Sequence, residues 1–221
     1  MTGKSKTLIV ILAFITMVVG AFTFKVMRQK PAMPTQSVNE IAKGLDIEAV
    51  IYPKAKQLPD FTMTAHTNTA FTQQELLGKW SIVFFGFTFC PDICPTTMAS
   101  LGEIADNIPN DVAAQTQFVF VSVDPERDTV EQLAGYVPFF NEEFIGVVGS
   151  AEQLEVFSKS LGAVYVKVPF GDSYQMQHTG RVFIINPQGQ RFGIFAEDHS
   201  NPGVLDVATM TNDLTKIVQN F

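Results

Sequence analysis

Two cysteines are the residues whose type and spacing offer the clearest chemistry in this chain. Cys90 and Cys94 are the only cysteines among its 221 residues, and the motif CPDICP contains both. The motif follows a continuous apolar run, SIVFFGF, and precedes a segment with helical character. Sulfur at the start of a helix lies near the positive end of the helix dipole and near unpaired N–H groups, which lower a thiol pKa. Such a thiolate pair binds soft metals or exchanges disulfides.

Three chemical roles are open for the cysteine pair. A structural disulfide is the weakest, because it would close a very small loop and restrict the unfolded chain little. A redox dithiol would cycle through the same disulfide. A metal site is the third role, and zinc fits it poorly because a structural zinc ion takes four Cys or His ligands. Copper(I) accepts two thiolates and one imidazole, and the spacing alone supports the copper and redox roles about equally.

The elements that must position the cysteines alternate between strands and helices. Strands are predicted at 61–65, 70–71, 81–87, 118–123 and 144–148, and helices at 95–107, 128–140, 150–161 and 203–220. N-terminal caps are predicted at Thr72, Asp128 and Ser150. A hairpin of 180–186 and 191–195 surrounds the turn PQG. The βαβαβ order predicts an α/β fold, thioredoxin-like, with a central mixed sheet flanked by helices.

Three histidines are available as a third metal ligand. His199 lies in the turn-like stretch DHSNPG, and His66 has polar neighbours at a predicted hairpin tip, so both are expected at the surface. His178 follows the stretch 171–177, which is predicted to be a loop, and precedes the run GRVFIIN. In a thioredoxin-like sheet this loop approaches the cysteine loop, so His178 is the predicted imidazole ligand. Met176 is a weak auxiliary candidate.

The N-terminal region predicts a membrane anchor. Residues 7–24 carry no charge, and as a helix they would be roughly 27 Å long, close to the ~30 Å thickness of the bilayer core. The run ends in AFTFK, a poor cleavage site, which favours an uncleaved transmembrane helix over a signal peptide. We therefore divide the chain into an anchor at 1–30, a tether at 31–57 and a thioredoxin-like copper-binding domain at 58–221.

Charge separates the anchor from the rest of the chain. Residues 1–30 contain five basic and no acidic residues, which leaves ten basic and 22 acidic residues after them. A domain this acidic is a poor candidate for nucleic-acid binding. The basic residues nearly balance across the anchor and do not set its orientation. A single-pass protein of the bacterial inner membrane is expected, with its soluble domain in the periplasm and the mitochondrial intermembrane space as the second choice.

Three motifs carry a family resemblance. In order and spacing, GFTFCPDICPTT, VSVDPERDT and HTGRVFIINPQG resemble the Sco/SenC family of membrane-anchored copper proteins. The resemblance implies a thioredoxin-like fold that binds one Cu(I) or Cu(II) per chain. It implies that Cys90 and Cys94 are the thiolate ligands and His178 the imidazole ligand. Asp124, in the second motif, matches an acidic residue that the family places near the site.

The resemblance implies two functions. In the first, the protein is a metallochaperone that delivers copper to the CuA site of cytochrome c oxidase during assembly, and its partner is the CuA-bearing subunit or another exported copper or thiol protein. In the second, it is a thiol–disulfide oxidoreductase that keeps partner cysteines reduced, with Cys90 attacking and Cys94 resolving the mixed disulfide. Whether the chain is an enzyme therefore stays open. A peroxidase is weaker, because the sequence shows no clear peroxide pocket.

Two positions depart from the family pattern. Gln177 stands immediately before the predicted histidine ligand, where the family often has Asp, and Phe89 precedes the first cysteine, where some members have His. A carboxylate before the histidine would orient the imidazole and raise its basicity, whereas an amide would do so less. We therefore hypothesise that this chain retains Cu(II) weakly and binds Cu(I) normally.

Overall fold

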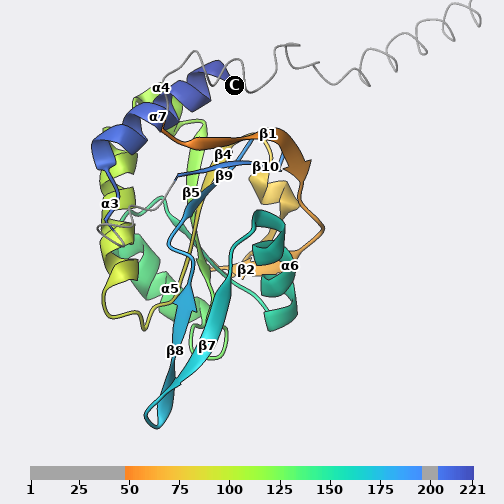
Figure 1. Ribbon diagram of the computed structural model, residues 1–221, viewed down its shortest axis with the longest axis vertical. Coiled ribbons are helices and arrows are strands. Elements are labelled where there is room, and N and C mark those ends of the chain that lie inside the picture. Colours follow the sequence, from red (N-terminus) through yellow and green to blue (C-terminus); the bar gives the residue numbers. More distant parts are fainter. Residues whose placement is uncertain (1–47, 196–203) are drawn as a thin grey trace, which may run out of the picture. The chain divides into compact units, whose positions relative to one another are not determined.

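The computed structural model describes residues 48–195 and 204–221 (Figure 1). The described strands are β1 (Val50–Gln57), β2 (Thr62–Ala65), β3 (Ala70–Thr72), β4 (Trp80–Gly86), β5 (Thr116–Ser122), β6 (Ile145–Val148), β7 (Tyr165–Phe170), β8 (Ser173–His178), β9 (Val182–Ile185) and β10 (Gln190–Phe195). The described helices are η1 (Gln73–Leu76), α3 (Ile93–Asn107), α4 (Asn110–Ala113), α5 (Val130–Tyr136), η2 (Val137–Phe139), α6 (Ala151–Leu161) and α7 (Val207–Asn220).

One mixed sheet organises the described residues. Its strand order is β1-β10-β9-β4-β5-β6-β2-β3, with β4, β5 and β6 parallel and the neighbours on either side antiparallel. Helices cover both faces of the sheet (Figure 1). This arrangement confirms the predicted α/β class and mixed sheet. Because β4 and β5 are parallel, their carboxyl ends meet at one edge, where α/β sheets place their ligands.

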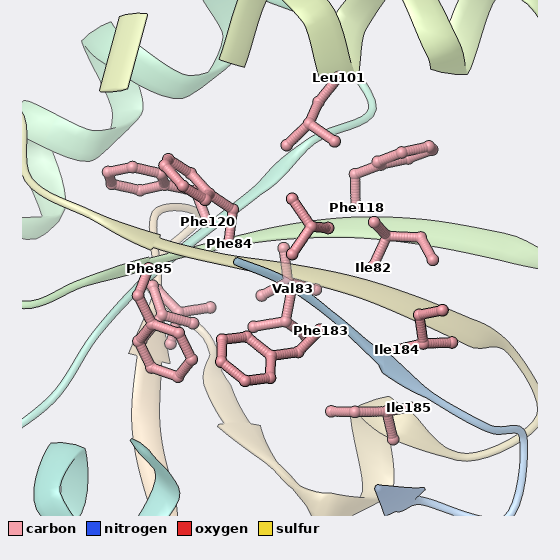
Figure 2. Close-up of a cluster of buried hydrophobic side chains, with 14 of the residues drawn as sticks. Ile82, Val83, Phe84, Phe85, Leu101, Phe118, Phe120, Phe183, Ile184 and Ile185 are labelled. Carbon is pink, nitrogen blue, oxygen red and sulfur yellow. The ribbon is translucent and has the colours of Figure 1, made fainter. Parts of the chain in front are cut away.

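The central strand β4 is buried on both faces. Ile82 and Phe84 point to the side of the sheet where Leu101 of α3 packs (Figure 2). Phe85 points to the other side, where its ring centroid lies 6.0 Å from that of Phe157 in α6. Each fully buried side chain of this size contributes roughly 1.5–3 kcal/mol through removal of apolar surface from water. The end of β4, and the loop that follows it, are therefore held by the core.

Two of the three predicted helix caps are confirmed. Thr72 forms a capping box at η1, and the Ser150 hydroxyl accepts a hydrogen bond at the start of α6. The cap predicted at Asp128 is wrong, because α5 begins after Thr129, whose hydroxyl accepts from the N–H of Gln132. The physical reason is that Asp128 is buried and its carboxylate is already bonded to side chains from other elements.

The predicted loop at 171–177 is mostly a strand. Residues of this stretch form β8, which pairs with β7 as a separate two-stranded sheet. The segment is too polar to predict a buried strand, but its side chains alternate between two faces. Tyr174, Met176 and His178 share the face of β8 whose contacts are with the rest of the domain. The hairpin projects from the domain in Figure 1.

The domain also begins earlier than predicted. β1 lies within the stretch 31–57 that was predicted to be a tether, and it pairs antiparallel with β10 at the edge of the sheet. None of its side chains is fully buried, so the segment lacks the apolar pattern that predicts a strand. In the described ranges no helix has the length and apolar character needed to cross a bilayer. The predicted anchor at 7–24 and His199 lie outside those ranges.

Candidate metal centre

The two cysteines lie where β4 leads into α3. Cys94 is fully buried in the first turn of α3, whereas Cys90 is half-buried in the loop before it. The Cys94 backbone N–H donates a hydrogen bond to Cys90 Sγ at 3.3 Å. First-turn N–H groups have no partner within their own helix, so the sulfur satisfies one of them. The helix begins at Ile93, two residues before the predicted start, and Pro95 is tolerated because it lies in the first turn.

Gly86 makes room for the buried sulfur. A Cβ atom at this position would lie 3.1 Å from Cys94 Sγ and 2.7 Å from Cε2 of Phe120. Carbon atoms essentially never approach this closely without a shift of the neighbour. Glycine at the end of β4 therefore leaves the space in which Cys94 and the Phe120 ring pack against the sheet.

His178 reaches the cysteines from the end of β8. Its Nε2 atom lies 3.3 Å from Cys94 Sγ, and its Nδ1 atom lies 3.1 Å from the carbonyl oxygen of Thr179. A carbonyl only accepts, so Nδ1 donates to Thr179, and Nε2 is the ring nitrogen that faces the sulfur. The rings of Phe84 and Phe87 meet the imidazole edge-on, with centroids 5.9 and 6.0 Å away. The structure thus brings all three predicted ligand residues together.

The two thiols have opposite electrostatic surroundings. The hydrogen bond from the Cys94 thiol, together with His178 and nearby backbone N–H groups, lowers the pKa of Cys90 to about 4, although partial burial opposes this. The pKa of Cys94 is raised, because its thiol donates a hydrogen bond to the Cys90 sulfur, is buried and faces the negative charge of that sulfur. Cys90 is therefore the first of the pair to ionise. A metal ion that binds both sulfurs must displace the Cys94 proton.

The donor set fits copper(I) chemically. Two sulfurs and one imidazole are soft to intermediate ligands, and apolar rings surround the imidazole. Within the described residues, no three His, Cys, Asp or Glu side chains stand in the geometry of a formed metal site. Cys90 and His178 therefore both lie beside Cys94, but the three donor atoms are not arranged around a common metal position. Cys90 is the donor with room to adjust, since it lies in a loop and is half-exposed.

The acidic residue predicted near the site binds other partners. Asp124 is buried, and its carboxylate accepts hydrogen bonds from Nε of Arg127 at 2.5 Å and from the Tyr174 hydroxyl at 2.7 Å. Gln177 is exposed, on the opposite face of β8 from His178. The Thr179 carbonyl, and not residue 177, thus orients the imidazole, in the way that outer residues orient metal-bound histidines.

The other candidates lie apart from the trio. His66 is half-buried, and its Nδ1 accepts a hydrogen bond from the N–H of Gly146 at 3.0 Å, so the expectation of a purely solvated surface residue is wrong. The histidine binds the edge of β6 because β2 pairs with that strand. Met176 is buried and lines a cavity of about 330 Å³ beside Asp124.

Asp128 supports the cysteine loop, a role that the sequence analysis does not predict. The Asp128 carboxylate accepts hydrogen bonds from the Thr88 N–H at 3.0 Å, from the Thr88 hydroxyl at 2.5 Å and from the Ser122 hydroxyl at 2.6 Å. These bonds fix the loop two residues before Cys90. The signal in the sequence was the motif VSVDPERDT, whose second Asp is this residue.

Comparison with known proteins places these residues in a family. Residues 51–217 match the family model described as SCO1/SenC. The chain is 32% identical over 162 residues to a protein of Stutzerimonas stutzeri that is named for copper binding, covering 73% of this chain and 79% of that protein. It is 33% identical over 162 residues to the mitochondrial SCO1 homolog 1 of Arabidopsis thaliana, covering 73% of this chain and 47% of that protein.

A solved structure shares the fold. The crystal structure of Arabidopsis thaliana ScoI with copper bound superposes with a TM-score of 0.67 at 32% identity, covering 74% of this chain and 98% of that one. The region that matches the family model includes the cysteine loop, the turn after β5 and the hairpin that carries His178. The chain belongs to the SCO1/SenC family.

Proposed function

We propose that this protein is a metallochaperone that binds one copper ion through Cys90, Cys94 and His178 and delivers it to the CuA-bearing subunit of cytochrome c oxidase. The observation that carries the proposal is the convergence of two cysteine sulfurs and an imidazole nitrogen at the end of the central sheet. Family membership supports copper as the cargo, because one relative is named for copper binding and a similar structure holds copper.

Transfer requires ligand exchange and no change of oxidation state. Thiolates of the partner replace the three donors one at a time, and copper remains Cu(I). One proton lost by the partner thiols returns to Cys94, Cys90 is released as a thiolate, and any remaining proton goes to solvent. Cys90 is the donor that an incoming thiolate can displace first, because Cys90 is half-exposed and Cys94 is buried. The low pKa of Cys90 makes it a ready ligand and a good leaving group.

Copper stoichiometry of the chain tests this proposal. The reduced protein is loaded with Cu(I) without oxygen, and we expect one tightly held copper per chain. Cys94→Ala and Cys90→Ala should abolish tight binding, and His178→Ala should weaken it. Arg181→Ala, which changes an exposed residue three positions after the histidine, is the control. Wild-type binding by His178→Ala would rule out the proposed site.

A second function is favoured by one observation: Cys90 is half-exposed and its pKa is lowered to about 4. As a thiol–disulfide oxidoreductase, the Cys90 thiolate would attack a partner disulfide and release one partner thiolate. Cys94 would then attack the mixed disulfide, which leaves a Cys90–Cys94 disulfide here and a reduced dithiol on the partner. A trapped mixed disulfide with Cys94→Ser would support this role, and partner reduction unaffected by His178→Ala would separate it from copper transfer.

We further propose that the uncharged stretch 7–24 holds the protein in the bacterial inner membrane, with the copper domain in the periplasm. Delivery to an exported oxidase subunit requires this side of the membrane. Protease digestion of spheroplasts tests the orientation. Digestion of the domain from outside is expected, and protection until lysis would contradict it.

A further inference from the structure

The two halves of the site belong to different parts of the fold. Cys90 and Cys94 follow β4 of the main sheet, whereas His178 ends β8 of the separate hairpin formed by β7 and β8 (Figure 1). The 3.3 Å separation between Cys94 Sγ and His178 Nε2 therefore depends on how the hairpin is held against the domain.

Side chains of the turn after β5 hold the hairpin. The Tyr174 hydroxyl donates to Asp124, and Nη1 of Arg127 donates to the Tyr174 carbonyl at 3.2 Å. The Arg127 guanidinium carbon also lies 3.8 Å from the centroid of the Tyr174 ring. Lys167 of β7 pairs with Glu126, but both are largely exposed, and such pairs contribute little. Asp124 and Arg127 are the main attachment.

Arg127 also contacts the cysteine half. Its guanidinium carbon lies 5.1 Å from the ring centroid of Phe89, the residue before Cys90, and 5.9 Å from that of Phe87. The Phe87 ring in turn meets the imidazole of His178. A single side chain thus lies between the loop that carries the first sulfur and the strand that carries the imidazole.

Contacts with aromatic rings hold the Arg127 guanidinium in place, in addition to its ion pair with Asp124. Its Nε donates to Asp124, its faces meet aromatic rings, and its Nη2 is buried with no hydrogen-bond partner among the described residues. Leaving a buried donor unpaired is unfavourable, so a planar group in this place is retained for its packing. We propose that Arg127 is a positioning residue that sets the separation of His178 from Cys90 and Cys94, an inference that rests on the proposed copper site.

The effect of losing Arg127 on copper affinity should depend on the oxidation state of the copper. Two thiolates supply most of the affinity for soft Cu(I), whereas Cu(II) depends more on the imidazole. Loss of Arg127 should disturb the sulfurs less than the imidazole, because the core holds Cys94 and Asp128 holds Thr88 at the start of the cysteine loop. Arg127→Ala should therefore lower Cu(II) affinity about tenfold, the lower end of the range for outer residues of metal sites, and change Cu(I) affinity much less.

Three variants and two readouts test this inference. Copper affinities in both oxidation states, and the Cu(II) absorption spectrum, are measured for Arg127→Ala, Arg127→Lys and the control Arg181→Ala. Arg127→Lys should behave like Arg127→Ala, because lysine keeps the charge but lacks the planar fork. In a His178→Ala background, Arg127→Ala should have no further effect on Cu(II). Wild-type behaviour of Arg127→Lys, or an undiminished effect in the His178→Ala background, would overturn the positioning role.

The second readout needs no copper. Hydrogen exchange of the metal-free protein should show faster exchange of β8 amides in Arg127→Ala, with β4 and β5 unchanged. Unchanged β8 exchange would overturn the inference, even if the wild-type protein binds copper through the three proposed ligands. If the wild-type protein binds no copper while β8 exchange responds as expected, the proposed function fails and the attachment of the hairpin stands.

Discussion

The cysteine half and the histidine half of the site are built in different ways. All seven residues of β4, which leads to the cysteines, are buried. Of the six residues of β8, which carries His178, Met176 is buried and the others are half-buried or exposed. The sulfurs are therefore placed by the hydrophobic core, and the imidazole is placed by a few polar and aromatic contacts. Changes in the first half should cost global stability, and changes in the second should cost site geometry.

The largest difference between the two halves is expected when one phenylalanine in each half is replaced by alanine. Phe84→Ala removes a fully buried ring from β4 and should lower the free energy of unfolding by about 3–5 kcal/mol. Phe170→Ala, at the end of β7, removes a ring that is 67% exposed and should change it by less than about 0.5 kcal/mol. Urea denaturation of the metal-free protein measures both. Similar losses from the two variants would mean that the hairpin belongs to the same core.

A smaller loss is expected from Gly86→Ala. The added Cβ would meet Phe120 and Cys94 Sγ, and such overpacking costs about 1–3 kcal/mol. Because the Phe120 ring has to shift and the sulfur is crowded, copper affinity should fall together with stability. Denaturation and copper titration check the two effects, with Gly135→Ala as the control, where an added Cβ meets no atom within 4 Å. Unchanged copper binding would show that Cys94 tolerates displacement.

In the histidine half, Tyr174→Phe removes the hydrogen bond to Asp124. We expect a loss of about 1 kcal/mol, typical of one hydrogen bond, because the aromatic ring and its contact with Arg127 remain. Hydrogen exchange should locate this loss in β7 and β8. Faster exchange spread evenly over the main sheet would contradict the separation of the two halves.

The smallest effect is expected from Gln177→Asp. The exposed side chain lies on the opposite face of β8 from His178, whose Nδ1 is bound to the Thr179 carbonyl. The new charge should therefore shift the ratio of Cu(II) to Cu(I) affinity by less than about threefold, since it acts at a distance through solvent. Competition titrations in both oxidation states measure the ratio. A tenfold shift would restore the hypothesis that this position tunes Cu(II) retention.

Local patterns determined the cysteine half of this protein. The apolar runs predict β4 and β5 because a strand buried on both faces needs continuous apolar residues, and both strands are confirmed. The spacing of Cys90 and Cys94, at a strand end and before a proline, predicts two sulfurs at a helix start. These features depend on neighbours along the chain, so a sequence alone carries them.

The residue His178 could be predicted from the sequence, but only the tertiary structure decided how the histidine half is built and held. His178 contacts Cys94, which is 84 positions away in the sequence, and Asp128 accepts a hydrogen bond from Thr88, which is 40 positions away. No local sequence pattern indicates either contact. β8 is polar because its hairpin packs on the domain through one face and a few contacts, which hides it from a search for apolar periodicity. The imidazole lies beside the sulfur because a separate hairpin is attached there, and that attachment exists only once the chain has folded.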